Sequence, residues 1–178
     1  MQYPTHPVPS YPSIQPHLHA APRLPPKSFR CVLFPADSTR RPSVVEVLTS
    51  PVLYSAHPTA RMPHPEVHMD SPNSTGGARA WDYCTINALD GIERPLSQPY
   101  IVFFPTMSQD GSPFPINQTI RDIQGPNFKD QCAWRGNVVI GKYTAANDPF
   151  NSLIDAGTQD FAIIRNLIRS RASPRTFY

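Results

Sequence analysis

The sequence predicts a small α+β domain, in which a mixed or antiparallel sheet carries a C-terminal helix on one face, behind a disordered proline-rich N-terminal tail. Three observations support this fold class. Short apolar runs end at proline, glycine or turn residues, one amphipathic stretch lies near the C-terminus, and 15 of the 23 prolines fall within residues 1–72. Proline fixes φ and lacks a backbone N–H, so dense runs of it resist helix interiors and central strands.

The tail is expected to cover residues 1–27, where Tyr, Pro, Ser and His alternate without a period. Such a composition buries too little apolar area to offset the entropy of ordering the chain. Residues 28–171 are predicted to form a single domain, a size typical of one folding unit. Within it, residues 55–78 are rich in proline and turn-forming residues and are predicted to be a long loop, and residues 172–178 form a short tail.

Five apolar runs are predicted to be strands. They cover residues 29–34, 43–48, 81–86, 100–104 and 138–143. The run Tyr100-Ile-Val-Phe-Phe104 lacks polar–apolar alternation, which predicts burial on both of its faces.

The helix is predicted from Thr158 to about Arg171, with Thr158 as its cap and Pro174 just beyond its end. Its apolar stripe consists of Phe161, Ile164, Leu167 and Ile168. Arg165 and Arg169 fall on the opposite side, so the stripe is predicted to face the core. A second, shorter helix or turn is indicated by the spacing of Ile116, Ile120 and Ile123.

The stretch GNVVIGKYT, residues 136–144, contains most of a phosphate-binding loop, because Gly136 is followed after four residues by Gly141 and Lys142. The intervening residues include three β-branched side chains, which favour extended backbone over a curved cradle. Tyr143 replaces the hydroxyl residue that would hold magnesium, and a turn follows instead of a helix. The stretch is therefore predicted to be a strand, and no cofactor-binding residue is assigned.

The proline-rich tail contains Pro22-Arg-Leu-Pro25-Pro-Lys27, which has the P-x-x-P-x-K form bound by SH3 domains. Such a segment is already extended and loses little entropy when it docks into an aromatic groove. Pro22, Pro25 and Lys27 are therefore the candidate partner-binding residues. Together with the missing catalytic motifs, they favour a non-catalytic protein-interaction module with SH3-like partners.

A first alternative is a small hydrolase or metal-binding protein that uses His57, His64 and His68. All six histidines precede residue 69, and the stretch His64-Pro-Glu-Val-His68 resembles a zinc-protease signature. Pro63 and Pro65, however, oppose the helix that would place both imidazoles on one face. The sequence contains no G-x-S-x-G elbow and no S-x-x-K motif, so no catalytic or metal-ligating residue is assigned.

A second alternative is a nucleic-acid accessory protein. The net charge of +3 is concentrated at one end, because residues 161–178 contain four arginines and no acidic residue. These are Arg165, Arg169, Arg171 and Arg175. A nucleic-acid interface usually needs a basic patch over a whole face, so a solvated helix end is the favoured interpretation and nucleic acid is not an expected partner.

Cysteine usage indicates a reducing compartment, because Cys31, Cys84 and Cys132 are odd in number and lack any C-x-x-C spacing. No apolar run approaches the ~18 residues of a membrane span, so no membrane partner is expected. The N-terminus lacks the pattern of a secretory signal. We therefore expect a cytoplasmic or nuclear protein.

Three segments together resemble a group of uncharacterised fungal proteins. They are Pro115-Ile-Asn-Gln-Thr-Ile-Arg-Asp-Ile-Gln-Gly125, then Trp134-Arg-Gly-Asn-Val-Val-Ile-Gly-Lys-Tyr143, then Asp155 with the Asp160-Phe-Ala-Ile-Ile helix start. The resemblance covers about residues 100–170. It implies no activity, cofactor or substrate, and it supports reading this part of the chain as the folded unit.

Overall fold

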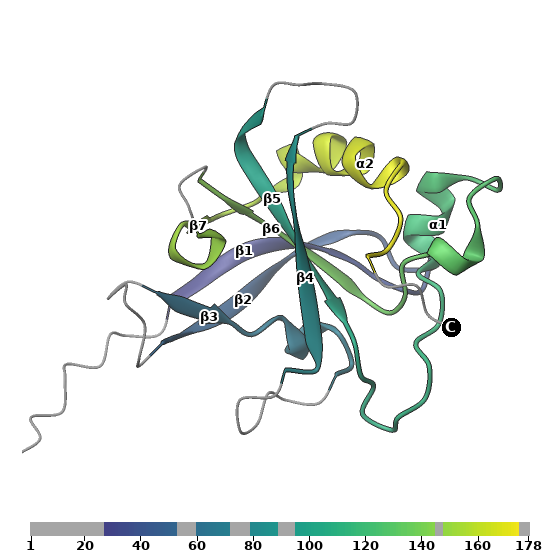
Figure 1. Cartoon of the computed structure of the whole chain (residues 1–178), viewed down its shortest axis with the longest axis horizontal. Helices are drawn as coiled ribbons and strands as arrows, with labels where there is room; N and C mark the ends of the chain where they lie inside the picture. The colour runs from purple at the N-terminus through teal and green to yellow at the C-terminus, as the bar shows by residue number, and fades with distance from the viewer. Residues whose placement is uncertain (1–26, 53–59, 72–78, 89–94, 145–147, 175–178) are drawn as a thin grey trace, which may run out of the picture.

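The computed structural model describes residues 27–52, 60–71, 79–88, 95–144 and 148–174. An antiparallel sheet curls through this part of the chain, and two helices cover one of its faces (Figure 1). The strands are β1 (Lys27–Phe34), β2 (Ser43–Pro51), β3 (Arg61–Pro63), β4 (Trp81–Ala88), β5 (Pro95–Pro105), β6 (Val138–Tyr143) and β7 (Leu153–Ile154). Their order is β3-β2-β1-β6-β5-β4, with β7 also paired to β6. The predicted α+β class is confirmed, and the sheet is antiparallel throughout.

The central strands β5 and β6 are buried on both faces, as the unbroken apolar run of residues 100–104 predicted for β5. Residues Tyr100–Pro105 of β5 and all of β6 are buried. Alternate side chains of these strands enter two separate cores. One core lies under the helices and contains Trp134, while the other is enclosed by the curl of the sheet and contains Met69 and Trp81. Hydrophobic side chains on two faces therefore fix the register of each central strand.

The helices are α1 (Gln118–Gln124) and α2 (Phe161–Arg169), which pack against each other on the outer face of the sheet. Single 3-10 turns are η1 (Pro65–His68), η2 (Asp130–Cys132), η3 (Pro149–Asn151) and η4 (Thr158–Asp160). The predicted apolar stripe of α2 does face the core, with Ile164, Leu167 and Ile168 buried. Among the described residues, no helix has the length and hydropathy needed to span a membrane.

The start of the C-terminal helix differs from the prediction. Thr158 does not cap α2 but is the first residue of η4. Gly157 is the N-cap of η4, and Asp160 is the N-cap of α2. The Asp160 carboxylate accepts a 2.7 Å hydrogen bond from the Gly157 N–H. A carboxylate reaching back to a cap N–H satisfies an orphan donor and favours the positive end of the helix dipole.

Two predicted boundaries are wrong. The tail was expected to include Lys27, but Lys27 begins β1 and pairs with Thr49 of β2. The expected loop 55–78 contains β3 and η1. Both elements accommodate their prolines, because β3 is an edge strand and Pro65 occupies the first turn of η1. The rest of the predicted tail lies outside the described residues.

The structure confirms that GNVVIGKYT is not a phosphate loop. Residues Val138–Tyr143 form β6, between β1 and β5. Gly136 turns the chain into this strand with φ of +64°, and a Cβ placed there would lie 2.6 Å from Pro105 Cγ. The glycine is required for the turn and for close packing, and the Lys142 side chain lies in the interior rather than at an anion site.

Candidate functional site

The candidate site is a pocket between the β1–β2 connection, α1 and α2, with a volume of about 440 Å³. We call it the arginine pocket. Its apolar lining comes from Phe34, Pro42, Ile123 and Phe161, and its polar lining from Ser38, Arg40, Arg41, Thr119, Asp122 and Arg165. Segments far apart in the sequence therefore meet here, since the lining runs from residue 34 to residue 165.

Hydrogen bonds position the connection that carries two of the arginines. The Asn137 side chain accepts a 2.8 Å bond from the Ala36 N–H, and the Ala36 carbonyl accepts a 2.9 Å bond from the Gln118 N–H. Next in the chain, Asp37 accepts bonds from the backbone and hydroxyl of Thr39. These bonds favour the ionised carboxylate and hold the pKa of Asp37 below its ordinary value.

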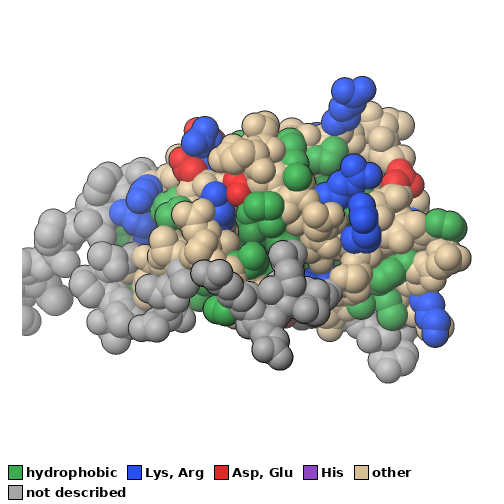
Figure 2. Space-filling model, turned by 90° about the horizontal axis from the view of Figure 1, so that it is seen from above, with side chains coloured by type: hydrophobic (Ala, Val, Ile, Leu, Met, Phe, Trp, Pro, Cys, Tyr) green, Lys and Arg blue, Asp and Glu red, His purple; other side chains and the backbone are tan. Residues whose placement is uncertain are grey.

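The pocket combines an apolar floor with a net positive rim. Arg40, Arg41 and Arg165 are exposed, and Asp122 is the one acidic residue among the lining residues. Figure 2 looks down on the side of the molecule that carries α2 and shows basic side chains beside exposed apolar ones. Guanidinium groups present several donors in a fixed plane and suit carboxylate or phosphate oxygens.

A buried hydroxyl lies in the wall of the pocket. Thr119 is 9 % exposed, and its Oγ1 has no hydrogen-bond partner among the described residues. Buried polar groups are nearly always partnered, so this hydroxyl is free to bond a water molecule or a ligand. The arginine pocket thus provides cationic donors, a spare hydroxyl and apolar surface, and it lacks any nucleophile–base pair among its lining residues.

The residues predicted to contact SH3-like partners fall largely outside the described chain. Pro22 and Pro25 lie in residues 1–26, which the structure does not describe. Lys27 belongs to β1, where its ammonium lies 4.6 Å from the centre of the Phe29 ring. Lys27 is exposed but forms part of the sheet rather than of a tail.

The histidine cluster is only partly within the described chain, because His57 lies outside it. His64 bonds Ser50 and Glu66 through its two ring nitrogens, and the His68 Nε2 lies 2.8 Å from the Glu46 carbonyl oxygen. No group of three or more metal-ligating side chains occurs among the described residues.

The C-terminal arginines have different roles. Arg165 lines the arginine pocket, and Arg169 is exposed on α2. Arg171 is structural, because its guanidinium bonds the Ala88 carbonyl and its own carbonyl accepts bonds from Gln124 and Trp134. Arg175 lies outside the described residues.

Sequence reasoning missed Arg40 and Arg41. The segment Ser38-Thr-Arg-Arg-Pro42 has two adjacent arginines between two strand runs, but nothing in it indicates a shared pocket with a residue as distant in the chain as Arg165. Only the docking of α1 and α2 beside the β1–β2 connection brings Arg165 to the same pocket.

Comparisons with known protein families, curated proteins and solved structures find no match for this chain. The resemblance to uncharacterised fungal proteins therefore stays a prediction.

Proposed function

We propose that the protein is a protein-interaction module that binds an acidic segment of a partner protein in the arginine pocket. The observation that carries the proposal is the combination of three exposed arginines with an apolar floor in one hollow. A segment with carboxylates beside one large apolar side chain complements both parts. Arginine and buried apolar anchors are the contacts that most often dominate such interfaces.

An acidic peptide fits better than nucleic acid. Nucleic-acid sites need cations distributed along a groove or face, whereas these three arginines surround one hollow of about 440 Å³. Asp122 at the rim also repels a polyanion more strongly than a short segment that carries one or two charges. The expected SH3-directed motif, whose residues Pro22, Pro25 and Lys27 end at the first residue of β1, is proposed as a separate contact of the same module.

The test measures binding of a panel of fluorescein-labelled peptides in which Asp or Glu flanks a single Phe or Leu, using fluorescence polarisation. We expect saturable binding by a subset of the panel and weaker binding at higher salt, because exposed charge pairs are screened. Arg40→Glu and Arg165→Glu should each weaken binding at least ~10-fold, since each reverses a charge that contacts the ligand.

Arg169→Glu is the matched control, because Arg169 lies on the same helix and is exposed but does not line the arginine pocket. It changes the net charge by the same amount as Arg165→Glu. Equal loss of binding in both variants would show that only the overall charge of the protein matters, and it would overturn the assignment of this pocket. Peptides that contain the apolar residue but no acid should not bind.

A further inference from the structure

A serine, a histidine and a glutamate form a hydrogen-bonded relay at the β2–β3 hairpin. Ser50 Oγ lies 2.9 Å from His64 Nε2, and His64 Nδ1 lies 3.1 Å from Glu66 Oε1. This is the order of contacts that activates a nucleophile: hydroxyl, imidazole, carboxylate. The three residues lie within 17 positions of one another, yet no known sequence motif indicates them.

The hairpin builds the relay. Ser50 pairs with Met62 in the β2–β3 register, and the His64 N–H bonds the Leu48 carbonyl at 2.9 Å. His64 therefore lies diagonally across the hairpin from Ser50, a separation that a long side chain can span. Pro65 then starts η1, which turns the Glu66 carboxylate back to His64.

Hydrogen-bond chemistry assigns the protons when Glu66 is ionised. A carboxylate only accepts hydrogen bonds, so the bond to Glu66 requires a proton on His64 Nδ1. In a neutral imidazole the other nitrogen then carries a lone pair. His64 Nε2 consequently accepts from the Ser50 hydroxyl, which is the polarity that a general base needs to remove the serine proton.

The burial of Glu66 costs free energy, whereas Ser50 and His64 remain partly exposed to solvent. Glu66 is 4 % exposed, and its Oε2 has no hydrogen-bond partner among the described residues. A buried carboxylate oxygen without a partner destabilises the fold, and such groups are often found at functional sites. The side chain of His64 remains 33 % exposed, and Ser50 is half-buried, so an electrophile can approach the outer end of the relay.

We propose that Ser50 is a reactive nucleophile, activated by His64 as general base and with Glu66 as the positioning residue, that acts on activated acyl esters. In the first step the Ser50 Oγ–C bond forms, the hydroxyl proton moves to His64 Nε2, and the ester C–O bond breaks. The departing alkoxide takes that proton from His64. Water, deprotonated by the same nitrogen, then hydrolyses the acyl-serine and restores the Ser50 hydroxyl.

We restrict the substrates to activated esters. The relay supplies a nucleophile and a base, and these two groups lower only part of the barrier to acyl transfer. A good leaving group departs with less stabilisation of the tetrahedral oxyanion than an amide requires. The relay is also separate from the arginine pocket. Pro42 directly precedes β2 and Ser50 lies near the other end of that strand, about 25 Å away at ~3.3 Å per residue. Reactivity at Ser50 can therefore be tested independently of peptide binding.

The experiment treats the full chain with a biotinylated fluorophosphonate and locates the adduct by peptide mass spectrometry. In this reaction the Oγ–P bond forms, the P–F bond breaks, fluoride leaves and His64 retains the proton. We expect a single adduct on Ser50 that Ser50→Ala abolishes. His64→Gln should slow labelling at least ~100-fold, as expected for loss of a general base.

His68→Gln is the matched control, because His68 ends the 3-10 turn that His64 precedes, and in the described contacts its side chain bonds only a backbone carbonyl. It should label at the wild-type rate. Labelling of wild-type protein should also become faster as the pH rises, because only a neutral imidazole can take up the serine proton. Glu66→Gln should shift the plot of labelling rate against pH along the pH axis and also lower its maximum rate. If Glu66 only stabilised the fold, the substitution would change the maximum rate alone.

Three results would overturn the proposal: no adduct on Ser50, equal rates in wild-type and His64→Gln proteins, or a rate independent of pH in the wild-type chain. Circular dichroism of each variant verifies that it is folded. The wild-type pH profile needs no variant, so it decides the question even if a substitution prevents folding. Release of 4-nitrophenol from 4-nitrophenyl acetate, lost in Ser50→Ala, then tests turnover on an acyl ester.

Discussion

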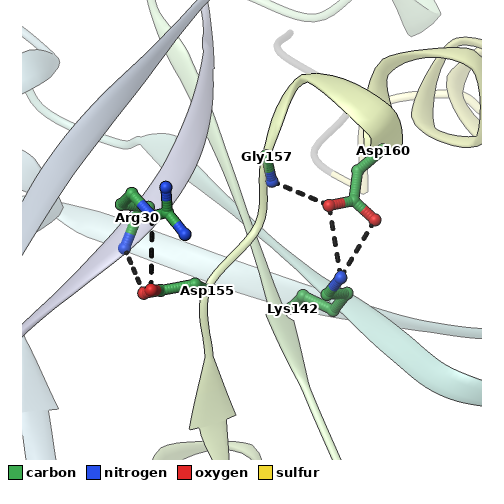
Figure 3. A network of polar contacts seen from close by, with 5 residues as sticks. All are labelled: Arg30, Lys142, Asp155, Gly157 and Asp160. Carbon is green, nitrogen blue, oxygen red and sulfur yellow. Dashed lines mark hydrogen bonds and ion pairs between the residues drawn. The ribbon is translucent and has the colours of Figure 1, made fainter.

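The Lys142 ammonium lies 3.1 Å and 3.2 Å from the two carboxylate oxygens of Asp160, and both residues are buried (Figure 3). The same carboxylate accepts the Gly157 N–H and, at 2.8 Å, the Tyr100 hydroxyl. These contacts connect β5 and β6 to the start of α2. The lysine that completes the phosphate-loop pattern in the sequence is therefore neutralised inside the protein, where it fixes the position of the C-terminal helix.

Replacing Lys142 with Met should lower the free energy of unfolding by about 3 kcal/mol, because it leaves the Asp160 charge buried without its counter-ion. Urea denaturation of wild type and variant measures the difference. The double variant Lys142→Met/Asp160→Asn should be less destabilised than Lys142→Met alone, since it removes the uncompensated charge. Equal losses in the single and double variants would contradict this interpretation.

The exposed pair in Figure 3 is the control for that experiment. Arg30 Nε lies 3.2 Å from Asp155 Oδ2, and the two side chains are 57 % and 50 % exposed. Arg30→Gln should cost less than about 1 kcal/mol, because solvent screens an exposed ion pair. If Arg30→Gln lowered the free energy of unfolding more than Lys142→Met, burial would not determine how much each ion pair contributes to stability.

The pH dependence of stability should contain a contribution from Asp160. Burial raises the pKa of its carboxyl, but the Gly157 N–H, the Tyr100 hydroxyl and the Lys142 ammonium together hold the pKa below its ordinary value. A lowered pKa in the folded state contributes stability above the unfolded pKa of about 3.9, and this stability is lost as the pH falls through the folded pKa. Urea midpoints measured between pH 7 and pH 2 should show this loss in wild type. The difference between the midpoints of wild type and Asp160→Asn should become smaller toward low pH.

Thiol reactivity should follow burial. Burial, followed by the nearby Asp155 charge, raises the pKa of Cys31 to about 12, and burial raises that of Cys84 to about 11. At pH 8 the native Cys31 thiol should therefore react with 5,5′-dithiobis(2-nitrobenzoate) at least ~10³-fold more slowly than an ordinary cysteine. All three cysteines are free, so three equivalents should react in guanidinium chloride. Rapid native modification of Cys31 would contradict the packing of β1.

Alanine at Gly136 should destabilise the protein more than alanine at Gly111. Both glycines have positive φ, of +64° and +76°, so both substitutions strain the backbone. Only at Gly136 would the new Cβ also meet side chains, with Pro105 Cγ at 2.6 Å, whereas nothing lies within 4 Å at Gly111. We expect Gly136→Ala to cost at least about 1 kcal/mol more by thermal denaturation. Similar melting temperatures would show that the Gly136 turn relaxes easily.

The sheet could be predicted from the sequence because local chemistry and burial agree in its strands. The runs 29–34, 100–104 and 138–143 are apolar at every second position or throughout, and each is bounded by residues that end strands. β3 and η1 could not be predicted in the same way. Prolines are tolerated there because β3 is an edge strand and Pro65 starts a helical turn, and edge position is a property of the assembled sheet.

The candidate sites were predicted much less well. The histidine cluster was considered for a hydrolase or a metal site with no residue assigned, and the sequence did not indicate the contacts of His64 with Ser50 and Glu66 that the described structure shows. No sequence pattern identified Ser50 as a site residue, because a serine before a proline at the end of a strand run is common. The four C-terminal arginines were considered as a group, yet of the three that the structure describes only Arg165 lines the arginine pocket, and Arg171 bonds the backbone.

By itself, the sequence determined the elements that a local pattern of side chains predicts. These are the strands, the amphipathic C-terminal helix, and the extended backbone between Gly136 and Lys142. Tertiary structure alone decided which distant groups meet, including Lys142 with Asp160, Ser50 with His64, and Arg40 with Arg165 around one pocket. The physical reason is the distance along the chain over which each effect acts. Backbone preference and burial periodicity act over a few residues, whereas a site depends on strand order and helix docking, which bring together groups far apart in the chain.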